Sequence, residues 1–174
     1  EDILTGVKNA IHAALVEANT SSDNVKVLII GTTHFDKALV QRTKLAQTGW
    51  ISMCLPSGSS ILPFAEWPNS LVSGMKGTYK LIKGGYEMTG NEISQLDHDE
   101  LISAAKELSD SGCNQIAVSS VFATVRGDME QEAFDILKKE IPNINISLSK
   151  NIGGMGLLEI ENEAIINAEP VSYT

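Results

Sequence analysis

Two threonines and a histidine stand where a short apolar segment gives way to a helix. Thr32, Thr33 and His34 follow the β-branched run 25–30 and precede a predicted helix at about 35–47. Ligands of α/β sheets bind at the carboxyl ends of strands, and hydroxyls beside a helix N-terminus suit an anion. The same hydroxyls also serve as ordinary helix caps. These three residues are therefore candidates for binding a substrate or a phosphate, with plain capping as the alternative.

A glycine-rich turn late in the chain is a lesser candidate. Gly153 and Gly154 precede the segment 156–167, which has the pattern of a helix and carries Glu161 and Asn162. Backbone amides in such a turn can cradle a carboxylate or a phosphate. A flexible turn without a ligand is the alternative for this segment.

Motifs for several other chemistries are missing from the sequence. No GxxxxGK followed by Ser or Thr is present and no GxGxxG follows a strand, so no complete nucleotide site is expected in this chain. The three histidines form no HxH or HxxxH pair, and Cys54 and Cys113 lie in no CxxC pattern. No metal site is predicted for that reason. The isolated chain is expected neither to bind nor to hydrolyse ATP.

The composition is that of an acidic globular chain. It has 174 residues, 43% of them apolar, which suits one domain with its own core, and a formal net charge of -9. That charge argues against DNA, RNA and anionic membranes as direct partners, because each requires a positive footprint. No apolar run approaches the ~20 residues of a spanning helix, and the N-terminus lacks the basic region of a signal peptide. We expect a single domain, residues 1–174, located in the cytoplasm.

Helices and buried strands alternate along the chain. Helices are predicted at 3–18, 35–47, 97–109, 128–140 and 156–167, and strands at 25–30, 50–55, 78–82, 115–122 and 143–148. Asp97 is expected to cap its helix while Glu100 closes a capping box, and Gly112 to end that helix. Segment 56–77 holds three prolines and is expected to be irregular. The alternation predicts an α/β fold with a mostly parallel or mixed sheet and flanking helices.

Several stretches, in order along the chain, resemble the N-terminal region of the hydantoinase/oxoprolinase family. They are the strand, turn and helix at 30–42, the segment 62–68, the glycine-rich hairpin 83–93 followed by Leu96 and Asp97, and the stretches 147–149, 152–153 and 156–168. Together they cover nearly the whole chain. The chain is therefore identified as similar to a hydantoin utilisation protein A-like subunit.

The resemblance implies part of a ribonuclease H-like, actin-like ATPase fold. It also implies an ATP-dependent enzyme that opens cyclic amides such as hydantoins or 5-oxoproline, with ATP and Mg serving the parent enzyme and no cofactor held by this chain alone. The implied partners are the remainder of the ATPase fold, a second hydantoinase-type subunit or domain, and the cyclic amide itself.

The chain departs from the family pattern at two places. Family members begin with a DxGGT hairpin that binds phosphate, which this sequence lacks, and Arg126 stands where the family commonly reads SPVNP-like. The chain is accordingly expected to be a fragment that is inactive alone.

Two alternatives to a cyclic-amide hydrolase stay open. Ketone carboxylases that use ATP share the same subunit type. A catalytically idle interaction or regulatory domain is the other alternative. A DxGGT hairpin upstream and a second ATPase half downstream in the full reading frame would favour an enzyme, and their absence would favour the idle domain.

Overall fold

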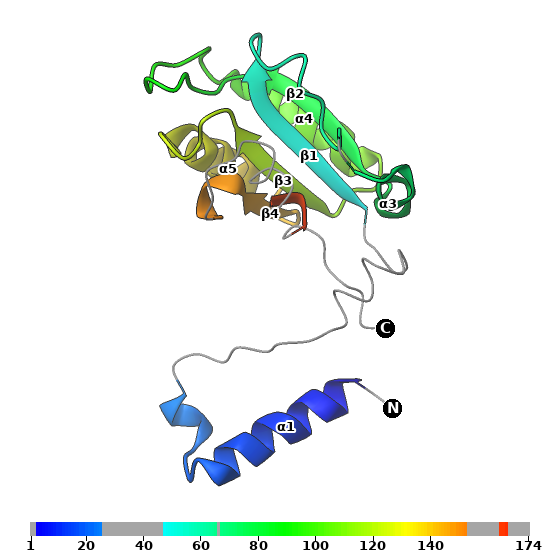
Figure 1. Cartoon of the computed structure of the whole chain (residues 1–174), viewed down its shortest axis with the longest axis vertical. Coiled ribbons are helices and arrows are strands. Elements are labelled where there is room, and N and C mark those ends of the chain that lie inside the picture. The colour runs from blue at the N-terminus through cyan, green and yellow to red at the C-terminus, as the bar shows by residue number, and fades with distance from the viewer. Residues whose placement is uncertain (1–2, 26–46, 66, 153–163, 167–174) are drawn as a thin grey trace.

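The computed structural model describes residues 3–25, 47–65, 67–152 and 164–166 (Figure 1). The helices are α1 (Ile3–Glu17), α3 (Asn69–Met75), α4 (His98–Asp110) and α5 (Asp128–Glu140), with the short 3-10 turns η1 (Ser22–Asn24) and η2 (Ser149–Asn151). The strands are β1 (Thr48–Leu55), β2 (Thr78–Lys83), β3 (Gln115–Ser120) and β4 (Asn145–Leu148). Within these ranges, none of the helices has the length and apolar character needed to span a lipid bilayer.

The four strands form one sheet in the order β2-β1-β3-β4. Every pair of neighbours is parallel, with Trp50 of β1 opposite Tyr79 of β2 and Ala117 of β3. The crossovers that parallel strands require are supplied by α3, α4 and α5, which follow β1, β2 and β3 in turn. The prediction of an α/β fold with a parallel sheet and flanking helices is confirmed.

Helices α4 and α5 cover one face of the sheet. The largest apolar cluster lies between them and the strands, and it includes Ile51, Met53, Leu101, Leu108, Ile116, Val118, Ala133 and Leu137. Residues of β1 alternate between the two faces, as a pleated strand requires. Trp50 therefore faces the other way, into a second cluster with Met75 of α3, Ala117, Ala164 and Ile165.

The predicted helix cap is present at the start of α4. Oδ1 of Asp97 accepts hydrogen bonds from the backbone N–H groups of Asp99 and Glu100, both at 3.1 Å. Glu100, expected to close a capping box, instead reaches β2, where its Oε2 accepts from the N–H of Lys83 at 3.2 Å. Gly112 ends the helical segment with a φ of 101°, a conformation that favours glycine.

Segment 56–77 is not irregular throughout, so that prediction is wrong for the residues of α3. The helix forms within a stretch rich in proline, serine and glycine because Met75 is buried and Leu71 packs against the cluster around Trp50. Tertiary packing outweighs weak helix propensity here. The predicted helix 35–47, apart from Gln47, and the predicted strand beyond Val25 lie outside the described residues, as does most of 156–167, of which 164–166 are helical.

Candidate functional site

The neighbouring strands β1 and β3 send their connections to opposite faces of the sheet. The chain leaves β1 toward α3, which packs on the Trp50 face, and leaves β3 toward α5, which packs on the face opposite. Diverging connections open a crevice at the carboxyl ends of the two strands. In open α/β sheets this topological switch point is where ligands bind.

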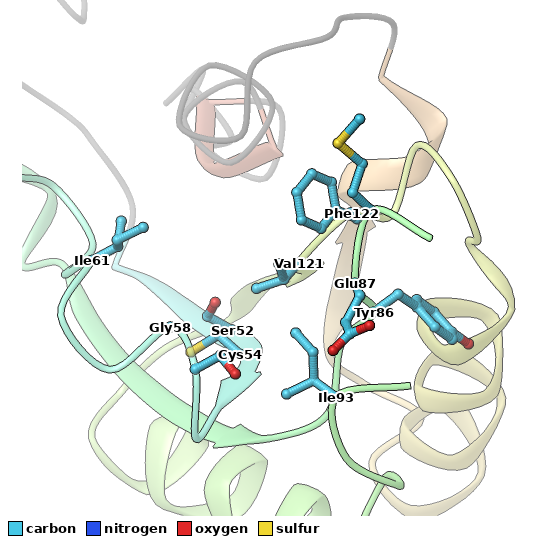
Figure 2. Close-up of a pocket in the computed structure, with 11 residues that line it drawn as sticks. Ser52, Cys54, Gly58, Ile61, Tyr86, Glu87, Ile93, Val121 and Phe122 are labelled. Atoms are coloured by element: carbon cyan, nitrogen blue, oxygen red, sulfur yellow. The ribbon is translucent and has the colours of Figure 1, made fainter. Parts of the chain in front are cut away.

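A pocket of 360 Å³ lies at this switch point (Figure 2). Its lining comes from the end of β1 (Ser52 and Cys54), the loop after β1 (within 57–61), the hairpin after β2 (within 86–93) and the segment after β3 (Val121 and Phe122). The volume is near the lower end of the roughly 300–1,000 Å³ typical of small-molecule sites. The pocket therefore suits a small organic molecule.

Few polar groups face the pocket. The lining residues carry the hydroxyls of Ser52 and Ser57, the Cys54 thiol and the Glu87 carboxylate, and the hydroxyl of Tyr86 is bonded to Asp128. None of the described lining residues is Lys, Arg or His. Glu87 Oε2 accepts a hydrogen bond from Thr89 Oγ1 at 3.2 Å. The pocket thus combines an apolar body with one negative charge.

The loop after β1 closes tightly on the strand that it leaves. The N–H of Gly58 donates to the carbonyl of Cys54 at 2.7 Å. A Cβ placed on Gly58 would lie 2.5 Å from the Cβ of Cys54, which only glycine avoids. Gly58 therefore lets the loop form one side of the pocket directly against the end of β1.

The hairpin after β2 forms the opposite wall. Gly85 adopts a φ of 89°, and a Cβ there would approach the carbonyl oxygen of Met53 to 2.7 Å. The N–H of Tyr86 then donates to the carbonyl of Val121 at 3.0 Å, and the N–H of Ile93 donates back to Gly85 at 2.9 Å. Gly85 thus allows the hairpin to pass across the ends of β1 and β3 and to be fixed there.

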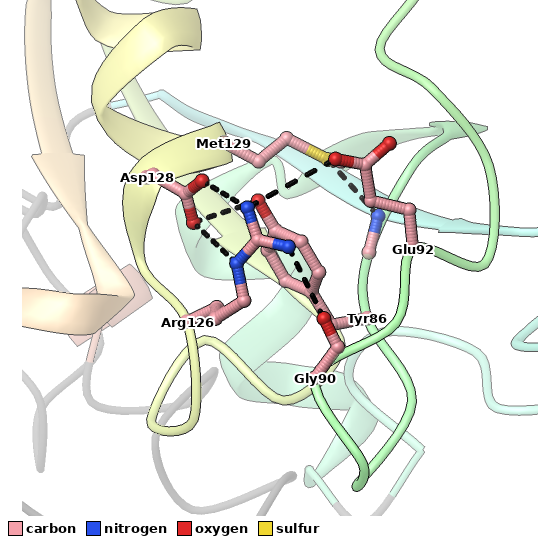
Figure 3. A network of polar contacts seen from close by, with 7 residues as sticks. Tyr86, Gly90, Glu92, Arg126, Asp128 and Met129 are labelled. Atoms are coloured by element: carbon pink, nitrogen blue, oxygen red, sulfur yellow. Dashed lines mark hydrogen bonds and ion pairs between the residues drawn. The ribbon is translucent and has the colours of Figure 1, made fainter.

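Arg126 fastens this hairpin to the turn that leads into α5 (Figure 3). Its guanidinium donates to Asp128 through Nε (3.3 Å) and Nη2 (2.5 Å), and through Nη1 to the carbonyl of Gly90 (3.1 Å). The hydroxyl of Tyr86 donates to the same carboxylate at 2.8 Å. Arg126, the position that departs from the family pattern, therefore links these two segments. We call the group formed by Tyr86, Arg126 and Asp128 the joint.

Charge and burial fix the protonation states in this joint. Burial of the ring, and then the hydrogen bond to Asp128, raise the pKa of Tyr86 to about 12. Hydrogen bonds from Arg126 and from Tyr86 hold the pKa of Asp128 below its usual value, and the contact with Asp128 raises that of Arg126. Tyr86 is a neutral donor and Asp128 an anion at neutral pH, so the joint is suited to holding the wall in place rather than to transferring protons.

A buried carboxylate ties together the ends of β3 and β4. Glu130 of α5 is fully buried and accepts from the N–H of Ser120 (2.8 Å), the hydroxyl of Ser149 (2.5 Å) and the N–H of Lys150 (2.8 Å). Burial raises the pKa of Glu130, although these three donors oppose that shift. In the described part of the chain, the Ser120 hydroxyl beside it has no hydrogen-bond partner.

The residues that the sequence proposed as a site are not among those described. Thr32, Thr33 and His34, and the lesser candidates Gly153, Gly154, Glu161 and Asn162, all lie outside the described residues. Sequence reasoning also missed the pocket residues Ser52, Cys54 and Glu87, for which the glycine-rich hairpin 83–93 was the only available signal. Over the described ranges, no group of three or more His, Cys, Asp or Glu side chains could hold a metal ion.

Comparison with known proteins places this geometry in context. A family described as "Hydantoinase/oxoprolinase N-terminal region" matches residues 1–141. No curated protein matches the chain in sequence. A similar solved structure is titled "Mechanism of ATP-Dependent Acetone Carboxylation, Acetone Carboxylase nucleotide-free structure"; it has a TM-score of 0.63 and 14% identity, over 89% of this chain and 25% of that one. The likeness shows a shared fold, and this chain spans a quarter of that neighbour's length.

Proposed function

The chain belongs to the hydantoinase/oxoprolinase N-terminal region family, and from this premise we propose that it is part of a larger ATP-dependent enzyme that opens cyclic amides. The substrates that the family description suggests are hydantoins and 5-oxoproline. The family match over residues 1–141 is the observation that carries the proposal. The switch-point pocket supports it, because its volume and apolar lining suit a small ring.

The chemistry explains why ATP would be required. Cyclic amides resist hydrolysis, and phosphorylation of the amide oxygen makes the carbonyl carbon a better electrophile for water. Water adds to that carbon, the ring C–N bond breaks with the nitrogen leaving as an amine, and the resulting acyl phosphate is hydrolysed by a second water to a carboxylate and phosphate. No described residue lining the pocket is basic, so the phosphates would be bound elsewhere. We propose that ATP and Mg bind to the remainder of the parent enzyme, and that this chain contributes the pocket.

Thr32, Thr33 and His34 remain our proposed contacts to the substrate or to a transferred phosphate. Their hydroxyls and imidazole would stabilise negative charge that develops at the predicted strand end beside the predicted helix N-terminus. In the parent enzyme, Thr33→Val and His34→Ala should each lower turnover at least about tenfold, equal to ~1.4 kcal/mol of barrier, with little change in melting temperature. Early melting with normal turnover per folded molecule would show that these residues only cap a helix.

Ketone carboxylation is the second candidate function. The observation in its favour is the shared fold with a structure of acetone carboxylase, at a TM-score of 0.63. The partners proposed for either function are the rest of the parent enzyme and a second subunit or domain. The cytoplasmic location stays a prediction.

A substrate panel separates the two functions. The complete polypeptide that contains this chain, purified with any partner that co-purifies, is incubated with Mg-ATP and either hydantoin, 5-oxoproline, or acetone with bicarbonate. ATP cleavage coupled to ring opening supports the proposal, whereas carboxylation of acetone without ring opening favours the second candidate. Calorimetric titration of the 174-residue chain with Mg-ATP should show no binding, and micromolar affinity would contradict the placement of the nucleotide elsewhere.

A further inference from the structure

We infer that the switch-point pocket binds a small neutral ligand that presents an N–H donor and an apolar substituent, and that Glu87 makes it discriminate against ligands that carry a carboxylate. The inference rests on the proposed function and narrows its substrate class. Neutral hydantoins with an apolar group on the ring fit this description, whereas 5-oxoprolinate does not.

The apolar part of the argument comes from the walls of the pocket. Ile61, Ile93, Val121 and Phe122 contribute to its lining, and Figure 2 shows them arranged around the hollow at the end of β1. A wall of this kind favours an apolar substituent, because burying apolar surface stabilises a complex by roughly 25 cal/mol per Å² before the costs of association. The volume of 360 Å³ accommodates a five-membered ring with one such substituent.

The polar part of the argument rests on Glu87. Its carboxylate lies beside Ile93 on the pocket side of the hairpin (Figure 2). Oε2 of Glu87 accepts a hydrogen bond from the hydroxyl of Thr89. The described contacts leave Oε1 of Glu87 open to accept a hydrogen bond from a ligand. An N–H of a cyclic amide is a donor of the required kind, and a hydrogen bond to an ionised acceptor is stronger than one between neutral groups.

The negative charge of Glu87 also determines which ligands the pocket excludes. No described lining residue is cationic, so nothing described in the wall offsets the negative charge of Glu87. The nearby guanidinium of Arg126 is held by Asp128 and by the Gly90 carbonyl. A second carboxylate beside Glu87 would meet like-charge repulsion. A neutral hydantoin avoids this repulsion, and acetone lacks the N–H donor.

Binding to the 174-residue chain tests the inference directly. The probes are 5-benzylhydantoin and 5-oxoprolinate, followed through the NMR methyl signals of Ile93 and Met88. The methyl of Met75, which is buried beside Trp50 and does not line the pocket, is the internal control. We expect 5-benzylhydantoin to shift the Ile93 and Met88 signals and to bind at least about tenfold tighter than 5-oxoprolinate, equal to ~1.4 kcal/mol. Equal affinities, or shifts at Met75 alone, would overturn the inference.

Three variants isolate the role of the carboxylate. Glu87→Gln should weaken 5-benzylhydantoin about tenfold, and Glu87→Lys should reverse the preference in favour of 5-oxoprolinate. Glu140→Gln removes an exposed acid at the far end of α5 and should change neither affinity. Circular dichroism confirms that each variant is folded, and an unchanged preference in both folded Glu87 variants would contradict a role for this carboxylate.

The outcome is separable from that of the proposed function. If the parent enzyme opens rings but Glu87→Gln leaves its preference among rings unchanged, this inference fails and the proposed function stands. If the pocket binds the neutral ring as described but the parent enzyme opens no cyclic amide, the binding site stands and the proposed function fails.

Discussion

The guanidinium of Arg126 lies over the ring of Tyr86, 4.4 Å from its centroid, while both side chains bind the carboxylate of Asp128 (Figure 3). Tyr86 belongs to the hairpin after β2, and Arg126 to the turn after β3. Both segments contribute residues to the lining of the switch-point pocket. The stacked pair therefore holds one lining segment against the other, and the properties of this joint can be measured without knowing the ligand.

Arg126→Lys should loosen the hairpin while keeping the positive charge. Lysine cannot reproduce the two-pronged contact with Asp128 together with the bond to Gly90. We expect faster amide hydrogen exchange at Gly90 and Ile93, whose N–H groups are bonded within the hairpin. Exchange in β3 provides the control and should not change. Unaltered exchange at both hairpin amides would mean that Arg126 does not hold the wall.

Tyr86→Phe should remove a pH dependence of stability in the alkaline range. The Tyr86 phenol has a pKa raised to about 12, against about 10 in an unfolded chain, so the folded state holds its proton more tightly. That contribution is complete below pH ~10 and is lost as pH rises through the folded pKa near 12. Denaturant unfolding from pH 8 to 12 should show the wild type losing stability relative to Tyr86→Phe as pH rises. Parallel curves would contradict the raised pKa.

Helix bounds and helix caps of this fold could be predicted from the sequence, because they depend on residues that are close together in the chain. The bounds of α5 match the predicted helix 128–140, and Asp97 caps α4 as expected, since a cap involves only the next three residues. Glu100 did not follow its local pattern, because its partner is the backbone of Lys83 on the adjacent strand. Contacts of this kind follow from the packing of elements, which a single sequence does not specify.

The pocket was not predictable for the same reason. It exists because β3 pairs with β1 on the side opposite β2, and the sequence predicts parallel strands without their order. The burial of Glu130 was not predictable either. Glu130 lies among the charged residues of an amphipathic helix, and that pattern predicts a surface residue. Only the structure places its carboxylate between Ser120, Ser149 and Lys150.

Glu130→Ala should be strongly destabilising. The change leaves three buried or partly buried donors without their acceptor and opens a small cavity, which together cost about 3 kcal/mol. Glu132→Ala on the same helix is the matched control, since Glu132 is exposed and pairs with the exposed His98, and should change stability by no more than about 0.5 kcal/mol. Urea unfolding of the three proteins measures both values, and equal small effects would show that the Glu130 network contributes little.

Asp97→Ala should lower the stability of α4 without altering the switch-point pocket. Its carboxylate satisfies the N–H groups of Asp99 and Glu100 at the start of the helix, and loss of such a cap costs about 1 kcal/mol. In a protein of this size, that loss lowers the melting midpoint by roughly 2–4 °C.

Two variants serve as controls for Asp97→Ala. Asp97→Asn retains an acceptor and should melt close to the wild type. Asp110→Ala, at the other end of α4, removes a negative charge from the C-terminal end of the helix dipole and should not destabilise. If Asp97→Ala and Asp110→Ala melt at the same temperature as the wild type, the carboxylate of Asp97 does not stabilise the start of α4.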